Sequence, residues 1–170
     1  MKRLWGLLIL LALFLLATGC GNTEGQKTTV EATISQLTQV EFESVGTHGL
    51  DNPIKDDFRK FTFNFEIEHA ANVERKVEFP LRNSWKEAIN SIDDKERYWY
   101  GGGHEQNNNS ENLATYHQVL VFYSKGLNED EMREAFNSIN TEVYLDLDGE
   151  TDIKEYKVSD LIEFDNNQNP

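Results

Sequence analysis

The chain has little cysteine, little proline and a shortage of positive charge. It contains one Cys and three Pro, with 16 Lys and Arg residues against 30 Asp and Glu residues. A single cysteine excludes internal disulfides and a site built from several thiolates, so the fold must be stabilised by packing. The acidic balance disfavours nucleic acid, because phosphate groups need a basic face. It also disfavours contact between side chains and anionic lipid.

Sequence signatures of catalysis are also missing. The chain has no nucleophile elbow, phosphate-binding loop, dinucleotide fingerprint or zinc signature. No internal repeat of 20 to 50 residues is visible, which excludes the repeat architectures. We therefore expect a protein that is not an enzyme and that has no cofactor.

The N-terminus has the pattern of an export signal. Lys2 and Arg3 precede the apolar stretch Leu4–Thr18. As a helix this stretch would be about 22 Å long, which is short for a bilayer core of about 30 Å. A positive start, a short apolar segment and small residues at its end are typical of a secretory signal peptide.

The small residues Ala17, Thr18 and Gly19 stand directly before Cys20, the one cysteine of the chain. This arrangement resembles the lipobox of bacterial lipoproteins, although Ala17 stands where that class usually has Leu. The resemblance implies that the Cys20 sulfur receives a diacylglycerol and that cleavage leaves Cys20 as the new N-terminus. Two acyl chains are sufficient for stable anchoring. The alternative is a structural cysteine after an uncleaved anchor.

These observations divide the chain into four parts. Removal of the signal peptide takes away two basic residues and changes the formal charge from −14 to −16. The small polar residues that follow Cys20 predict a flexible tether. The predicted parts are a signal peptide at 1–19, a lipidated tether at 20–29, a single globular domain at 30–165 and a tail at 166–170.

Alternation of apolar and polar residues predicts most of the strands. It is clearest in the segment 61–69, where Phe61, Phe63, Phe65 and Ile67 share one face. We expect this strand to form a hairpin with a second strand at 73–79. Residues 30–45 predict a long strand, two short strands or a helix. Further strands are expected at 97–100, 116–124 and 159–164.

The segment 142–158 predicts another hairpin, with its turn at Asp148 and Gly149. If Ile153 shares a face with Val143, Leu145 and Leu147, the turn needs three residues.

Two segments have helical periodicity. Trp85, Ala88, Ile89 and Ile92 follow it after Ser84, which could form a capping box with Glu87. In the second segment Asn128 and Glu131 form the box, and the apolar stripe consists of Met132, Ala135, Phe136 and Ile139. The fold class predicted from six to eight strands and two short helices is a mainly β, antiparallel immunoglobulin-like β-sandwich. The alternative is an α+β domain with both helices on one face of an antiparallel sheet.

Three segments are candidate sites. Asp146, Asp148, Glu150 and Asp152 alternate like the start of a calcium loop, but Gly and Glu are missing from the positions that an EF-hand requires. His104, Glu105 and His117 could bind zinc or copper, although their spacing matches no metal signature. Tyr98, Trp99 and Tyr100 could stack on the sugars of a cell-wall glycan, with Tyr98 and Tyr100 on one face of a strand.

The segment 101–112 contains three consecutive glycines and many Asn residues, which predicts a long flexible loop. If this loop binds a ligand, the expected contacts are Tyr98, Tyr100, His104 and Glu105. No metal ligand and no catalytic residue is assigned.

The expected function is that of a binding or accessory module in the bacterial cell envelope. The lipid on Cys20 would hold it at the outer face of the cell membrane, in a bacterium of the Gram-positive type. An envelope protein or a cell-wall glycan is the expected partner, and nucleic acid is not. The alternatives are an envelope hydrolase and a lipoprotein that binds or delivers metal.

Overall fold

The computed structural model describes residues 26–93, 95–108 and 111–165. The signal peptide, Cys20 and the tail lie outside these described residues, so the predictions made for them stay predictions. No helix within the described ranges is long and apolar enough to cross a membrane.

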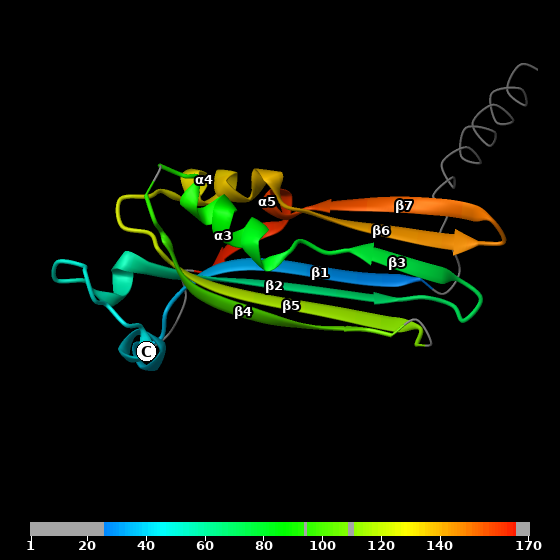
Figure 1. Cartoon of the computed structure of the whole chain (residues 1–170), viewed down its shortest axis with the longest axis horizontal. Helices are drawn as coiled ribbons and strands as arrows, with labels where there is room; N and C mark the ends of the chain where they lie inside the picture. The colour runs from blue at the N-terminus through cyan, green and yellow to red at the C-terminus, as the bar shows by residue number, and fades with distance from the viewer. Residues whose placement is uncertain (1–25, 94, 109–110, 166–170) are drawn as a thin grey trace, which may run out of the picture.

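Within the described residues, eight strands form two sheets that lie face to face (Figure 1). All neighbouring strands are antiparallel except β1 and β8, which are parallel. The large sheet has the order β4-β5-β2-β1-β8, with β1 (Lys27–Gln36), β2 (Phe58–Glu68), β4 (Tyr98–Asn107), β5 (Leu113–Tyr123) and β8 (Ile162–Asp165). The small sheet has the order β3-β6-β7, with β3 (Glu74–Glu78), β6 (Asn140–Leu147) and β7 (Glu150–Lys157).

The second layer is completed by helices. In Figure 1 the small sheet covers one half of the large sheet, and the helices α3, α4 and α5 cover the other half of the same face. A mainly β fold with two sheets and a few short helices is therefore confirmed, whereas the immunoglobulin-like arrangement is not confirmed. The helical segments are α2 (Gln39–Ser44), η1 (Lys55–Asp57), α3 (Arg82–Asn90), α4 (Glu129–Glu134), η2 (Ala135–Ser138) and α5 (Val158–Leu161).

The central strand β2 supplies the middle of the core. The predicted alternation is confirmed, because Phe61, Phe63, Phe65 and Ile67 are all buried while Asn64 and the glutamates of the strand are exposed. Aromatic rings from the second layer pack on this row. The ring of Trp85 lies 5.6 Å from Phe61 and 5.7 Å from Phe63, measured between centroids.

The predicted caps agree with the structure at one helix and not at the other. At α4 the Asn128 side chain accepts a hydrogen bond from the Glu131 backbone, and the Glu131 carboxylate accepts one from the Asn128 backbone. At α3 the cap predicted at Ser84 is wrong, because the helix begins at Arg82 after Leu81, whose side chain makes no capping hydrogen bond. The buried face of α3 is confirmed, because packing rather than capping places it.

Residues 30–45 combine two of the predicted alternatives. The first part is the strand β1, and the chain then turns at Thr38 into the short helix α2. A capping box between Thr38 and Glu41 begins this helix. Phe42 belongs to α2 and packs against Phe58, with 5.8 Å between ring centroids.

The predicted hairpin between β2 and β3 is wrong. β2 pairs with β1 from Arg59 to Glu68 on one side and with β5 along its whole length on the other. No free edge of β2 remains, so the chain leaves the large sheet after Glu68 and β3 pairs with β6 in the second layer. The two segments alternate as predicted, but alternation does not show to which sheet each strand belongs.

The predicted three-residue turn between β6 and β7 is also wrong. Leu147 pairs with Glu150, which leaves a two-residue turn at Asp148 and Gly149. Both turn residues have positive φ, 56° and 87°, as a type I′ turn requires. Ile153 consequently points away from the core and is 58 % exposed. The assumption that every aliphatic residue of the hairpin is buried caused the error.

We predict that Phe63→Ala destabilises the domain by about 3–5 kcal/mol, because it removes a fully buried ring and leaves a cavity. The matched control is Thr62→Ala on the opposite face of the same strand, which should cost much less. Urea denaturation followed by circular dichroism measures both variants. Equal midpoints for the two would contradict the assignment of the faces.

Candidate functional site

The segment that was predicted to be a flexible loop is an edge strand. β4 includes Gly101, Gly102 and Gly103 and continues to Asn107, and it pairs with β5 throughout. The prediction of a loop at 101–112 is therefore wrong for residues 101–107. Consecutive glycines predicted flexibility, but at two of the three positions the close approach of β5 leaves no room for a side chain.

Close packing against β5 explains two of the three glycines. A Cβ atom at Gly101 would lie 2.6 Å from the carbonyl oxygen of Val119, and one at Gly103 would collide with the carbonyl oxygen of His117. A Cβ at Gly102 would meet nothing within 4 Å. The side chain of Gln118 lies over this stretch and donates a hydrogen bond to the carbonyl oxygen of Gly102 at 3.0 Å.

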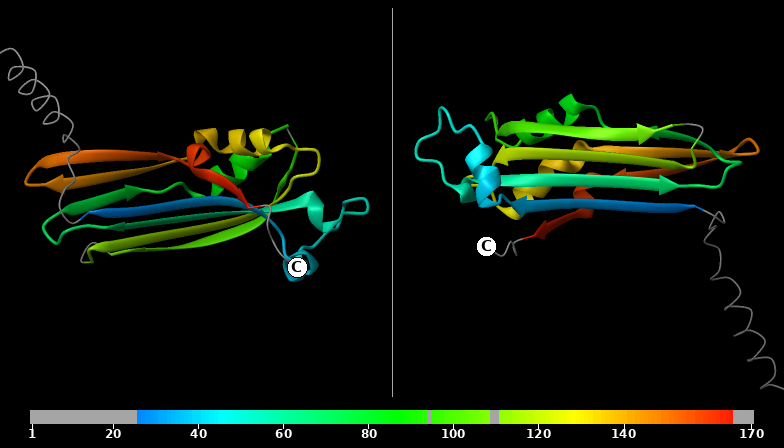
Figure 2. Two further views of the ribbon diagram at one scale, coloured as in Figure 1. Left: turned by 180° about the vertical axis from the view of Figure 1, so that it is seen from behind. Right: turned by 90° about the horizontal axis from the view of Figure 1, so that it is seen from below.

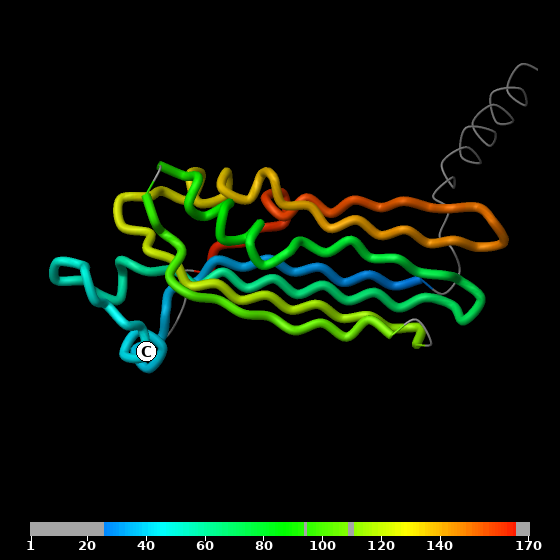
Figure 3. The backbone as a smooth tube through the Cα atoms, viewed as in Figure 1, coloured from blue at the N-terminus to red at the C-terminus, as the bar shows by residue number. Residues whose placement is uncertain are grey.

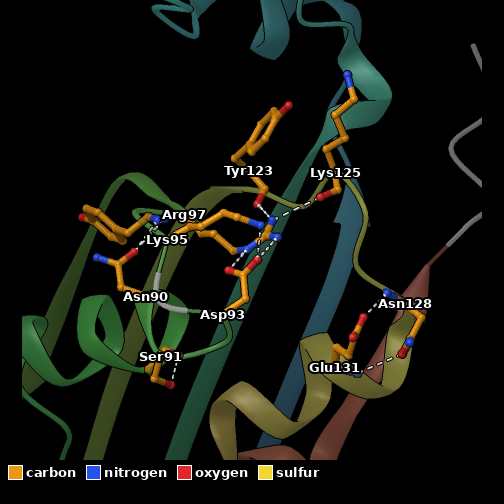
Figure 4. A network of polar contacts seen from close by, with 11 residues as sticks. Asn90, Ser91, Asp93, Lys95, Arg97, Tyr123, Lys125, Asn128 and Glu131 are labelled. Carbon is orange, nitrogen blue, oxygen red and sulfur yellow. Dashed lines mark hydrogen bonds and ion pairs between the residues drawn. The ribbon is translucent and has the colours of Figure 1, made fainter. Parts of the chain in front are cut away.

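A buried arginine holds the start of β4, as Figure 4 shows. The Arg97 guanidinium makes two hydrogen bonds of 2.7 Å to Asp93 and donates to the carbonyl oxygens of Tyr123 and Lys125. The Asn90 amide oxygen accepts from the Arg97 backbone. Hydrogen bonds from Arg97 and then from Lys95 hold the pKa of the Asp93 carboxyl well below its usual range. The bonds of Asn90 and Arg97 also tie the end of α3 to β4 and β5.

The four predicted ligand contacts are divided between the two faces of β4. Tyr98 packs against the main core, and Glu105 lies opposite Tyr116 on the same inner side. Tyr100 and His104 are on the outer side, where they pair with Val121 and His117. A bulge between Tyr98 and Tyr100 separates these two rings, so the prediction that they share a face is wrong.

The bulge also decides the position of Trp99. Its ring lies 5.7 Å from Phe58, in a small outer cluster that also contains Leu37 and Val121. The indole nitrogen donates a 2.6 Å hydrogen bond to the carbonyl oxygen of Gly46. The aromatic trio is thus used for packing on both sides of the sheet, and only Tyr100 keeps a substantially exposed ring. These contacts give no support to a sugar-stacking platform.

The structure brings His104 and His117 together. They are directly opposite each other on β4 and β5, and their ring centroids are 5.0 Å apart. Asn64 of β2 is the next residue in the same cross-strand row, and its side-chain oxygen lies 2.6 Å from Nδ1 of His117. Burial lowers the pKa of His117, and the neighbouring His104 lowers it further. We call these three residues the histidine cluster.

The histidine cluster lies on the outer face of the large sheet. In the right panel of Figure 2, α2 and the segment that follows it lie at one end of this face, and the strands are visible over the rest. Strand pairing places polar side chains around the cluster, and these are Thr29, Glu31, Thr33, Thr62, Glu66, Thr115 and Gln106.

The predicted metal trio is only partly assembled. His104 and His117 meet, but Glu105 points to the opposite side of β4 and cannot join them. In the described part of the chain, no group of three or more His, Cys, Asp or Glu residues is placed to hold a metal ion. In the hairpin between β6 and β7, the Asp146 carboxylate accepts hydrogen bonds from Gly149 and Thr151. That carboxylate therefore stabilises the turn.

The sequence did not indicate Asn64 as the partner of His117, although the alternation of the segment 61–69 places Asn64 on the face opposite the phenylalanines. The missing information was the pairing of β2 with β5. Comparison with known proteins adds no relative, since no protein-family model, curated protein or solved structure matches the chain.

We predict that Gly103→Ala destabilises the domain by about 1–3 kcal/mol, because the added methyl group must displace backbone atoms of β5. Gly102→Ala is the matched control and should be neutral or slightly stabilising, since it reduces the entropy of the unfolded chain. Urea unfolding of both variants tests this. A Gly103→Ala variant as stable as the wild type would show that the segment is loose.

Proposed function

We propose that the protein is a membrane-anchored extracytoplasmic lipoprotein that acts as a binding module of the bacterial cell envelope. The observation that carries this proposal is the single cysteine, Cys20, which follows an apolar export segment and three small residues. A lone thiol in an oxidising compartment would be reactive, and lipid attachment removes it. The mature chain would then remain at the outer face of the membrane.

The arrangement of the strands supports a defined orientation for the anchored domain. β1 begins at the end of the large sheet where Lys27 pairs with Glu68. Figure 3 shows that the turns between β2 and β3 and between β6 and β7 lie at this same end. Residues 21–25 separate Cys20 from the first described residue and can reach about 20 Å at most. The turns would therefore lie near the membrane, and the opposite end of the domain would point away from it.

The opposite end carries the surface that we assign to recognition. We call residues 39–57, which comprise α2, a connecting segment and η1, the free end. Its exposed aliphatic side chains include Val40 and Ile54, which are 74 % and 58 % exposed. A rigid β-sandwich that presents such segments would recognise partners as immunoglobulin-like modules do, through the ends of its strands. Exposed aliphatic groups suit an envelope protein better than a glycan.

We predict that Cys20→Ser abolishes lipid attachment and normal processing, because serine has no thiol to accept the diacylglycerol. Gly19→Ala is the control, since it keeps a small residue before the cysteine and should be processed normally. Incorporation of labelled fatty acid and the size of the chain in membrane fractions are measured in cells. Labelling of the Cys20→Ser variant equal to that of the wild type would disprove the lipoprotein assignment.

We predict that a photo-crosslinking residue at position 54 of the anchored protein gives a discrete adduct with an envelope protein. The matched control is position 153, where Ile153 has the same 58 % exposure but lies on β7. Val40→Asp should abolish the adduct by placing a charge in the contact. Equal adducts from both positions, or an adduct that is removed by a muramidase and not by a protease, would contradict recognition of a protein by the free end.

A further inference from the structure

The histidine cluster has a geometry that the proposed binding function does not use. His104 and His117 are opposite each other on antiparallel strands, on the outer face, with 5.0 Å between their ring centroids. Side chains of directly opposed residues are the closest neighbours across a sheet. The sheet itself therefore places two imidazoles together, and no loop has to become ordered to bring them into contact.

Asn64 determines which nitrogen of His117 is available. The Asn64 side-chain oxygen lies 2.6 Å from Nδ1 of His117, and an amide oxygen can only accept a hydrogen bond. The hydrogen of the neutral ring is thus on Nδ1, and Nε2 keeps a free lone pair. Metal-binding histidines commonly have this arrangement, in which one nitrogen donates to a protein oxygen while the other binds the ion.

The surroundings favour a cation. Glu66 lies diagonally next to His117 on the same face, and Glu31 pairs with Asn64. Lys60, a cation on the same face of β2, forms an ion pair with Glu41, with 2.6 Å between Nζ and Oε1.

We propose that His104 and His117 form a two-histidine site for a divalent cation of the Cu²⁺, Zn²⁺ or Ni²⁺ type. Nε2 of His117 and a ring nitrogen of His104 are the protein ligands, and water occupies the remaining positions. Imidazole suits these ions, whereas Ca²⁺ and Mg²⁺ prefer oxygen ligands. With two protein ligands, the ion keeps open positions for exchange. The site is independent of the lipid anchor and of the free end.

The test uses the untagged full chain with Cys20→Ser, purified in detergent, so that no thiol competes for the metal. It is titrated with CuCl₂, ZnCl₂ and CaCl₂ by isothermal calorimetry, and the Cu²⁺ complex is examined by electron paramagnetic resonance. We expect one equivalent of Cu²⁺ with nitrogen hyperfine splitting, weaker binding of Zn²⁺, and no binding of Ca²⁺. The midpoint temperature of thermal unfolding should rise in the presence of Cu²⁺, because the ion binds the folded state.

Substitutions of the two histidines test the ligands, and substitutions of Asn64 test the orientation of His117. His104→Gln and His117→Gln should each weaken Cu²⁺ binding at least about tenfold, and Asn64→Ala should weaken it about tenfold through loss of orientation. Asn64→Asp should restore binding, since its carboxylate also accepts from Nδ1. His48→Gln is the control, because His48 is exposed and lies outside the cluster. Circular dichroism and urea midpoints confirm that each variant is folded.

The proposal would be overturned by either of two results. The first is the same Cu²⁺ affinity in the wild type, His104→Gln and His117→Gln, which would place the ion elsewhere. The second is binding of Ca²⁺ without binding of Cu²⁺, or of no ion at all, since both exclude imidazole ligation.

Discussion

The structure depends on the burial of the apolar row of β2. Phe61 and Phe63 contact Trp85 from α3, and Phe61 also stacks on Phe136 of η2 with 4.3 Å between ring centroids. Phe65 makes an edge-to-face contact with Tyr156 from β7, with 5.4 Å between ring centroids. One strand thus holds both the helices and the small sheet against the large sheet. Without disulfides among the described residues, this packing is the main source of stability.

The same row determines the chemistry of the opposite face. Because side chains alternate along a strand, burial of Phe63 and Phe65 forces Asn64 outwards. Pairing of β2 with β5 and of β5 with β4 then aligns Asn64, His117 and His104 across the sheet. The glycines of β4 allow this edge strand to approach β5 closely enough for the alignment. The candidate metal site is therefore a consequence of the core on the other side of the sheet.

The local predictions and the long-range predictions had different outcomes. The faces of β2 and the capping box at Asn128 were predicted correctly, because each depends on residues close together in the chain, although the equally local cap predicted at Ser84 was wrong, since α3 begins at Arg82. The pairing of β3, the turn at Asp148 and the loop at residues 101–107 were predicted wrongly. The first depends on β6 as the partner strand of β3, and the third depends on the carbonyl groups of β5 that face Gly101 and Gly103. The turn depends on the exposed position of Ile153.

The amino-acid sequence by itself determined that the described chain is mainly β, which side chains of β2 are buried, and where α4 begins. Alternation and capping express these properties within a few residues. Only the tertiary structure decided that His104 meets His117 and Asn64 while Glu105 points away. Those relations depend on which strands are neighbours and on a bulge between Tyr98 and Tyr100. Contacts across more than fifty residues, such as that from Asn64 to His117, exist only when the whole sheet forms.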